Sequence, residues 1–397
     1  MAAPARYFEP VDFRTNFPAL GGIRAFALTL IFFVHYGGGF TGGRAVRLLE
    51  WVREQCWFSL DLTFVLSGFL ITGILYDTQA DSHFFKRFFG RRAIRILPIF
   101  YLVAIVLLLL TPIVHYRWRW MQLTFLIYIG NFFATSNLSL YVIPSAVHPR
   151  ASVLISHFWS LYVEEQFYLF WPLIVWWVRD RARVLWIAIG LCAISFIART
   201  IVVYSLHSVV AERWTNHTLP FRLDTILMGG ILALLLRGER ADQWQRACRW
   251  IFLAATMVVM TILLLPSGFG AALTRSVGVL FVAVASAGLV GCTLRAGSVA
   301  YRFFGMRPLR YFGRYSYGFF ILHILFFEEW IRLRLYLAHK LDSGNLAVVV
   351  TFLITFACVF LAAKLSYDLY EVRFLRLKRH FPYDLESAAH KHGYRLK

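Results

Sequence analysis

The sequence is poor in charged residues. Only 16% of its 397 residues are Asp, Glu, Lys or Arg, whereas 59% are hydrophobic. A soluble globular domain has about 25% charged and about 45–50% apolar residues. No hydrophilic stretch is long enough for a separate soluble domain of ordinary size. The scarcity of charge therefore excludes a chain built from soluble domains and indicates one membrane domain with short loops.

Acidic residues are scarcer still. The chain has 21 Asp and Glu against 41 Lys and Arg, a formal net charge of +20. Such an excess occurs in nucleic-acid-binding proteins. Here, however, the basic residues form short clusters between apolar runs, as they do in the cytoplasmic loops of membrane proteins. We therefore expect a surrounding lipid bilayer and no nucleic-acid partner.

Cysteine patterns and soluble-enzyme motifs are also missing. The five cysteines lie far apart and show no metal-binding or redox spacing, so we expect no metal site. The sequence contains no G-x-S-x-G, Walker loop or HExxH motif, and we expect no permanently bound cofactor. No signal peptide is evident, because the first apolar run begins near Leu20 and carries Arg24, which indicates a retained span.

Long apolar runs recur along the whole sequence. Each has roughly 17–25 residues, enough to cross about 30 Å of hydrocarbon as a helix. They predict an all-α, polytopic transmembrane helix bundle of about ten spans. A further run, 121–134, is only about 14 residues long and favours a short re-entrant or interfacial segment. The expected spans are 20–40, 56–76, 95–114, 157–178, 184–205, 220–237, 250–266, 271–293, 313–331 and 345–366.

The charges of the loops predict the orientation. With the N-terminus inside and 121–134 not crossing, the inside segments hold 26 Lys and Arg and the outside segments hold 11. Cytoplasmic loops carry the excess of basic residues. A crossing at 121–134 would reverse this for every later segment. We therefore predict a cytoplasmic N-terminus (1–19), a membrane domain (20–366) and a basic cytoplasmic tail (367–397).

Arg24 and His35 are ionisable residues in the first span. Charge in hydrocarbon is costly and usually lines a protein interior or a wet cavity. Eleven residues are close to three helical turns, so the two side chains share a face and lie about 16 Å apart along the axis. A guanidinium binds phosphate well and an imidazole accepts a proton near neutral pH, which together suit a long anionic substrate. The alternative is a histidine bonded to a neighbouring helix.

Two arginines stand just before the third span. Arg92 and Arg95 are spaced i,i+3 and share a helical face. They could bind phosphate groups on the cytoplasmic side. The alternative is ordinary anchoring by positive charge at the inner face.

The fourth span opens with His157 and carries Glu164. Glu164 is seven residues after His157 and four before Tyr168, so these three side chains share a face. Glu164 could be functional, or it could be a structural carboxylate bonded to an arginine on another span, such as Arg222. The remaining polar candidates within spans are Asp61, Arg222, Asp224 and His323, for which structural pairing between helices is the default.

Taken together, these residues resemble the motifs of the membrane-bound acyltransferase family 3, whose bacterial members O-acylate surface glycans and related molecules. The matches run in order from residue 20 to about 371, nearly the whole chain. They comprise the Arg24/His35 spacing, FVLSGFLIT at 64–72, RRAIRILP at 91–98, HFWSLYVEEQFY at 157–168, FRLD at 221–224, and RYSY at 314–317 followed by His323.

The resemblance implies a role for each candidate residue. His35 would be the catalytic histidine, and Arg24, Arg92 and Arg95 would hold the phosphates of an acyl-CoA co-substrate. Glu164 would assist catalysis by orienting the imidazole or engaging the acceptor. The candidates for binding the acceptor substrate are Trp159, Tyr168, Arg222, Asp224 and His323.

The resulting hypothesis is an integral O-acyltransferase of the bacterial cytoplasmic (inner) membrane. It would move an acyl group, by family frequency acetyl, to a hydroxyl of a carbohydrate or lipid-linked glycan at the outer face. His35 would act as general base or carry the acyl group briefly. Many family members have an additional C-terminal hydrolase-like domain, which we do not expect in this sequence. The transfer would therefore be completed within the membrane domain or by an unidentified partner protein. The alternatives are a lipid-linked glycan flippase, a small-solute transporter or a scaffold.

Overall fold

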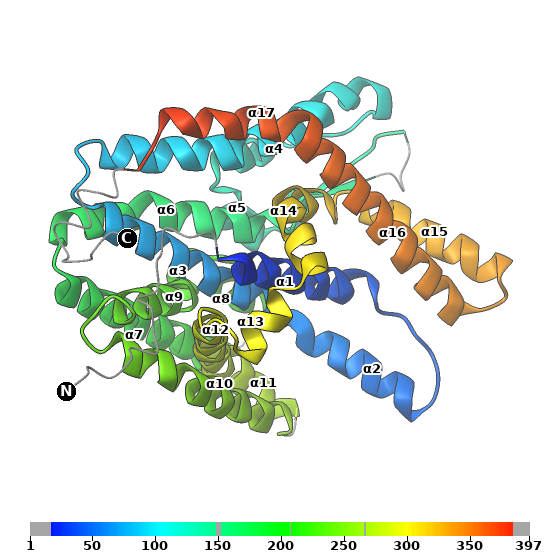
Figure 1. Ribbon diagram of the computed structural model, residues 1–397. Helices are drawn as coiled ribbons and strands as arrows, with labels where there is room; N and C mark the ends of the chain where they lie inside the picture. Colours follow the sequence, from blue (N-terminus) through cyan, green and yellow to red (C-terminus); the bar gives the residue numbers. More distant parts are fainter. Residues whose placement is uncertain (1–16, 148–151, 207, 266, 384–397) are drawn as a thin grey trace.

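The computed structural model describes residues 17–147, 152–206, 208–265 and 267–383 (Figure 1). Nearly all of this part is helical, and the prediction of an all-α bundle is confirmed. Within the described ranges, the only strands are β1 (Val142–Pro144) and β2 (Ser152–Leu154), which pair antiparallel. The α-helices are α1 (Pro18–Tyr36), α2 (Arg44–Gln55), α3 (Ser59–Thr78), α4 (Phe84–Val114), α5 (Gly130–Ser136), α6 (Phe158–Val178), α7 (Arg181–Ser205), α8 (Val209–His217), α9 (Leu223–Leu235), α10 (Ala241–Leu263), α11 (Ser267–Leu273), α12 (Val279–Thr293), α13 (Val299–Phe304), α14 (Arg307–Leu322), α15 (Phe327–Lys340), α16 (Gly344–Ser366) and α17 (Val372–Leu375).

Each of the ten predicted spans contains a helix. In the described part of the chain, seven helical stretches are long and apolar enough to cross a membrane. The predicted spans outside these seven correspond to α6, α9 and α14. Two glutamates interrupt the apolar character of α6, α9 has only 13 residues, and α14 ends early. The residues up to 16 of the predicted N-terminal segment, and those from 384 of the predicted tail, lie outside the described residues.

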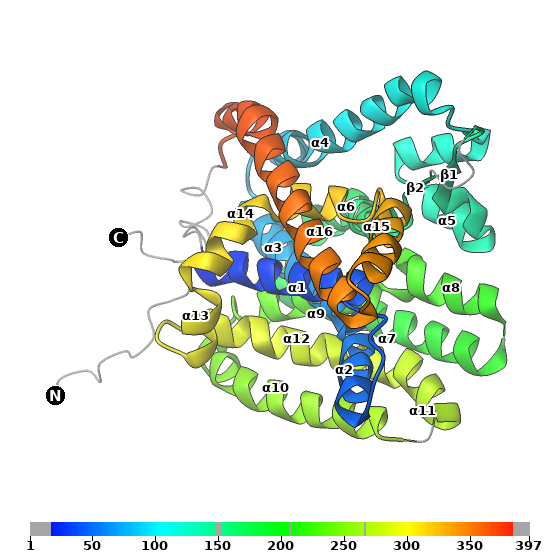
Figure 2. The same cartoon turned by 90° about the vertical axis from the view of Figure 1, so that its right-hand side faces the viewer.

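The ambiguous segment 121–134 contains no continuous spanning helix. A 3-10 helix, Trp120–Ile127, ends at Tyr128, whose φ of 61° breaks the helix before α5 begins. Farther on, the Ala146 N–H donates to the His115 carbonyl at 2.7 Å, so the chain returns to the end of α4 from which it departed. Figure 2 shows α5 and both strands beside the far end of α4. The expectation of a re-entrant or interfacial segment is confirmed.

The predicted continuous span at 313–331 is wrong, because the helix breaks within it. After α14 the chain turns through residues 323–326 and then enters α15. The freed backbone groups find partners elsewhere in the chain: the Tyr36 hydroxyl donates to the His323 carbonyl at 2.6 Å, and the Leu154 N–H donates to the Leu325 carbonyl at 3.0 Å. Satisfied carbonyls make a non-helical turn tolerable in a membrane protein.

Helix α3 lies near the middle of the bundle and packs against α1, α6, α9 and α12 (Figure 1). Two glycines let α3 and α9 approach closely. A Cβ at Gly68 would lie 1.8 Å from the Ile226 carbonyl oxygen, and one at Gly229 would lie 1.8 Å from that of Val65. Small residues at such crossings allow backbones to pack directly in membranes. The glycine of the 64–72 motif is therefore a packing residue.

The outer helices have apolar faces turned away from the bundle. In the most apolar window of α10 only 17% of residues are buried, against 67% in the stretch that contains α3. Large exposed side chains such as Ile194, Met257 and Leu353 belong to α7, α10 and α16. A helix that is apolar on its outward face needs a lipid environment. The chain is thus an integral, multi-pass membrane protein.

Candidate functional site

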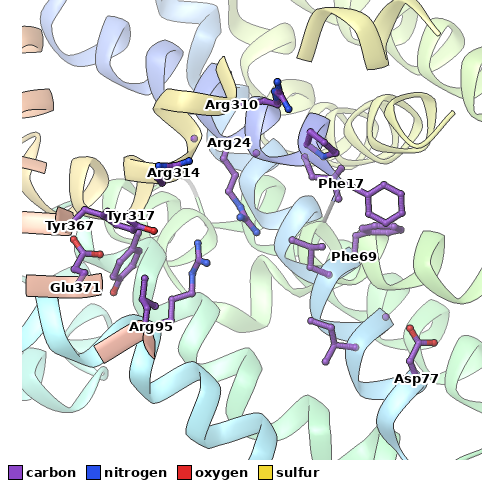
Figure 3. Close-up of a pocket in the computed structure, with 18 of the residues that line it drawn as sticks. Phe17, Arg24, Phe69, Asp77, Arg95, Arg310, Arg314, Tyr317, Tyr367 and Glu371 are labelled. Carbon is purple, nitrogen blue, oxygen red and sulfur yellow. The ribbon is translucent and has the colours of Figure 1, made fainter. Parts of the chain in front are cut away.

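A cavity of about 550 Å³ opens at the end of the bundle where α1 begins. Five arginines line it: Arg237 just after α9, and the four that Figure 3 labels, Arg24 on α1, Arg95 on α4, and Arg310 and Arg314 on α14. Glu371 stands on the same side as Arg95 (Figure 3). The cavity is therefore a basic chamber built from segments far apart in the sequence.

This chamber joins segments that loop charge predicts to be on one side. The predicted inside segments 1–19, 77–95, 237–249, 294–314 and 367–397 all contribute lining residues. Their convergence at one end of the bundle agrees with the predicted number of crossings. Which side of the membrane this end faces remains a prediction.

The C-terminal segment closes one wall of the chamber. The helix of the last predicted span continues past residue 366 through a π-turn, Tyr367–Glu371, into α17. Tyr367, Glu371 and Leu375 line the cavity. The Arg91 guanidinium at the start of α4 donates to the Phe381 carbonyl at 3.0 Å, which holds the segment against that helix.

A second cavity, of about 130 Å³, continues from the first. The two share Arg24, Leu70, Arg95 and Tyr317, so these residues form a common waist. Beyond the waist, both polar and apolar residues line the second cavity. The polar residues are Thr63, Ser67, Arg92, Ser160, Glu164, Tyr168 and Ser316, and the apolar ones include Leu28, Ile31, Leu60, Leu161 and Phe320.

Five of the arginines that line the two cavities have no ion pair with any described residue. Among the described residues, no carboxylate lies within 4.0 Å of the guanidinium of Arg24, Arg92, Arg95, Arg310 or Arg314. The other arginine of the first cavity, Arg237, pairs with Asp77 at 2.6 Å. Apart from the Arg237–Asp77 pair, five guanidinium groups and only two carboxylates, Glu164 and Glu371, are found among the described lining residues. This excess of positive charge favours a ligand with several negative charges.

Glu164 lines the second cavity together with two hydroxyl groups. Ser67 and Tyr168 hydrogen-bond to each other, and both line the cavity beside Glu164. The Arg92 guanidinium lies 4.6 Å from the centre of the Tyr168 ring. The structural alternative in which Glu164 pairs with Arg222 is excluded, because Arg222 pairs with Asp61. Glu164 and Tyr168 therefore belong to the arginine-lined part of the site.

His35 lies in the last turn of α1, beyond the apolar part of the second cavity. Ile31, one turn earlier on the same face, lines that cavity. The ring centres of His35 and His323 are 5.4 Å apart, and those of His323 and His157 are 5.1 Å apart. Phe320 lines the cavity and lies beside the His157 ring at 5.4 Å. One face of α1 thus leads from the arginines to a cluster of three histidines.

The other predicted acceptor residues do not line either cavity. Trp159 stacks on His217, with ring centres 4.5 Å apart and planes 28° apart. The Arg222 guanidinium lies 5.6 Å from the centre of the Phe64 ring, and the ring centres of Phe64 and Trp159 are 6.1 Å apart with a T-shaped arrangement. Trp159 and Arg222 are therefore close neighbours through Phe64.

Asp224 is engaged in a closed ion pair. Arg199 on α7 donates to both carboxylate oxygens, at 2.8 and 2.6 Å, and also to the Phe221 carbonyl at 2.7 Å. Both charged side chains are fully buried. The structure separates Asp224 from the residues around the cavities and joins α7 to α9 through it.

Sequence reasoning missed three residues of this site. Arg310 and Arg314 look like ordinary loop charges, although their i,i+4 spacing places them on one face with Tyr317 nearby. His157 was visible through its shared face with Glu164, yet it had no assigned role. Among the residues that the structure describes, no group of three or more His, Cys, Asp or Glu is placed to hold a metal ion.

Comparison with known proteins matches the chain to named relatives. It is 28% identical over 331 residues to the peptidoglycan O-acetyltransferase OatA of Listeria monocytogenes, covering 78% of this chain and 49% of the relative. It is 26% identical over 328 residues to the O-acetyltransferase OatA of Staphylococcus aureus, covering 77% of this chain and 50% of the relative. The chain thus spans about half the length of these relatives. No solved structure matches it.

The family comparison covers nearly the whole membrane domain. Residues 17–364 match the family model described as an acyltransferase domain. This range contains every motif of the resemblance noted above, and it begins and ends close to the first and last spans. The chain therefore belongs to acyltransferase family 3.

Proposed function

We propose that this protein is an O-acetyltransferase that moves an acetyl group from acetyl-CoA to a hydroxyl of a glycan. The observation that carries the proposal is the set of five arginines without ion pairs around two joined cavities. Coenzyme A carries a pyrophosphate and a further phosphate at one end of a long arm. Guanidinium groups bind phosphate oxygens in pairs, so this end of the donor suits the basic chamber.

The donor lies along the face of α1. Its phosphates occupy the chamber among Arg24, Arg95, Arg310 and Arg314. Its arm passes the waist and runs beside Leu28 and Ile31, and the thioester reaches the turn that carries His35. The eleven residues from Arg24 to His35 span about 16 Å, a distance that only a long ligand covers.

His35 supplies the proton chemistry. Its imidazole takes the proton of the acceptor hydroxyl as the oxygen attacks the thioester carbonyl. The tetrahedral intermediate then collapses, the acetyl ester forms, and the thiolate of coenzyme A leaves and takes up a proton. A transient acetyl-imidazole on His35 is the alternative route, and both routes need the same ring.

The acceptor class follows from the relatives. The OatA protein of Listeria monocytogenes is named as acting on peptidoglycan. We therefore place a glycan hydroxyl, polymeric or lipid-linked, at the histidine end of the site. Under the predicted orientation this end faces outward across the bacterial cytoplasmic membrane.

Arg95→Ala is expected to weaken binding of a non-hydrolysable acetyl-CoA analogue by roughly 10- to 150-fold. Removing one charge-assisted contact costs on the order of 1.5–3 kcal/mol. The measurement is calorimetric titration of the purified full chain in detergent. Arg44→Ala, on α2 at the opposite end, is the matched control and should bind as the parent does. If Arg95→Ala binds the analogue as tightly as the parent, the arginines only anchor the helix, and a transporter or flippase becomes the better hypothesis.

The predicted orientation has its own test. Reporter fusions after residue 90 and at the C-terminus should both report the cytoplasm, because the excess of Lys and Arg lies in those segments. A fusion near residue 145 should report the outer side. If the C-terminal fusion reports the outer side, the chamber would face outward, where cytoplasmic coenzyme A could not reach it.

A further inference from the structure

The three clustered histidines are not equivalent, and their hydrogen bonds distinguish them. We propose that His323 positions His35 by accepting an N–H from it at Nε2. The other ring nitrogen of His35 is then left free to take the proton of the acceptor hydroxyl. This inference rests on the proposed function, and it gives His323, which the sequence suggested as an acceptor-binding residue, the different role of positioning His35.

The tautomer of His323 is set by its own backbone. Its Nδ1 lies 2.7 Å from the Phe320 carbonyl oxygen. A carbonyl oxygen only accepts, so Nδ1 must carry the hydrogen, and a neutral ring then has a bare lone pair at Nε2. The side chain is 1% exposed, and Nε2 has no hydrogen-bond partner among the described residues. A buried acceptor of this kind is costly unless a donor meets it.

The neighbouring rings leave His35 as the donor. Nε2 of His157 donates to the Ile321 carbonyl at 3.0 Å, so its Nδ1 is a second bare lone pair and cannot donate to His323. Tyr36 gives its hydroxyl hydrogen to the His323 carbonyl. His35 makes no hydrogen bond to His323 in the structure, but their ring centres are 5.4 Å apart, about the separation of two imidazoles joined by an N–H···N bond of roughly 3 Å, so we propose that this bond forms in the working enzyme.

The fold holds His323 firmly enough for this task. It stands at the end of α14, where the helix breaks, and two hydrogen bonds fix its ring and its carbonyl. The second of these comes from Tyr36, the residue after His35, so the same turn of α1 is bonded to the same residue. Glu164, the other candidate for orienting the imidazole, is two turns along α6 from His157 and lines the second cavity with Ser67 and Tyr168.

A group that holds a catalytic histidine in one tautomer acts on turnover and not on donor binding. In the acetyl transfer, His35 gains the acceptor's proton on the free nitrogen while its other N–H stays bonded to His323. The thiolate of coenzyme A takes this proton from the ring as it leaves, so His35 returns to its starting tautomer. His323 itself neither gains nor loses a proton.

Two substitutions test this assignment. His323→Phe keeps a ring of similar size and removes the acceptor, whereas the longer amide of His323→Gln can place its oxygen near the position of Nε2. With acetyl-CoA and a soluble glycan oligosaccharide, His323→Phe of the purified full chain should lower kcat roughly 10- to 100-fold, with acetyl-CoA affinity changed less than about twofold. His323→Gln should recover most of the loss. If His323→Phe does not fold, His323→Asn replaces it, because its short amide reaches only the Nδ1 position.

A double-mutant cycle separates positioning from mere packing. If His323 acts through His35, His323→Phe should cost nothing further in a His35→Ala background, because residues that act as a unit are strongly non-additive. Full kcat in a folded His323→Phe protein would overturn the assignment. So would additive losses that His323→Gln does not rescue. An absence of acetyl transfer by the parent protein itself would instead contradict the proposed function.

Discussion

His35→Ala is expected to lower kcat for acetyl transfer by about 10²–10⁴-fold, because it removes the imidazole that we propose takes the hydroxyl proton. Donor affinity should hardly change, since the phosphates bind about 16 Å away along α1. The measurement combines transfer of labelled acetyl groups to a glycan with titration of the non-hydrolysable donor analogue. His339→Ala, an exposed histidine on α15, is the matched control. Near-normal kcat in a folded His35→Ala protein would refute both routes through His35.

The same protein can distinguish the two routes. If His35 carries the acetyl group, the parent should exchange labelled coenzyme A into acetyl-CoA without any acceptor, because the acetyl-imidazole forms reversibly. If His35 is a general base, that exchange needs the glycan. Both outcomes are compatible with a positioning role for His323, so this measurement concerns the chemistry alone.

Asp224→Ala is expected to destabilise the protein by about 3–5 kcal/mol. Its partner Arg199 is fully buried, and removal of one member of a buried pair leaves an uncompensated charge. Thermal unfolding in detergent, compared with the parent, measures the loss. The double replacement Arg199→Met with Asp224→Leu is the control and should recover much of the stability, because apolar residues can replace a buried pair at little cost. If Asp224→Ala is as stable as the parent but binds the glycan poorly, Asp224 belongs to the acceptor site.

The helices could be predicted because a run of about 20 apolar residues has few alternatives in a bilayer. The break between α14 and α15 could not. The residues at 323–326 include neither glycine nor proline, and the partners that satisfy the turn, Tyr36 and Leu154, come from distant parts of the chain. Hydropathy does not settle whether a short segment such as 121–134 crosses the membrane. The distribution of Lys and Arg among the loops predicts that it does not.

The site divides along the same physical line. Helical periodicity placed Arg24 and His35 on one face, and that face does join the cavities to the histidines. Pairing between helices depends on how each helix is rotated, which one span does not reveal. The sequence therefore could not show that Asp61 meets Arg222 or that His323 lies beside His35. From the sequence alone, Arg314 cannot be distinguished from an arginine that anchors a helix end at the membrane surface. Only its place in the cavity separates the two roles.

The basic chamber has a consequence for turnover. Acetyl-CoA and coenzyme A are identical at the end that the arginines hold, so those contacts stabilise donor and spent product equally, and equal binding of both does not by itself raise kcat. Spent coenzyme A is therefore expected to compete with fresh donor for the chamber. Under the proposed function and orientation, the rate of glycan acetylation would follow the ratio of acetyl-CoA to coenzyme A in the cytoplasm, which would couple modification of the outer surface to the metabolic state of the cell.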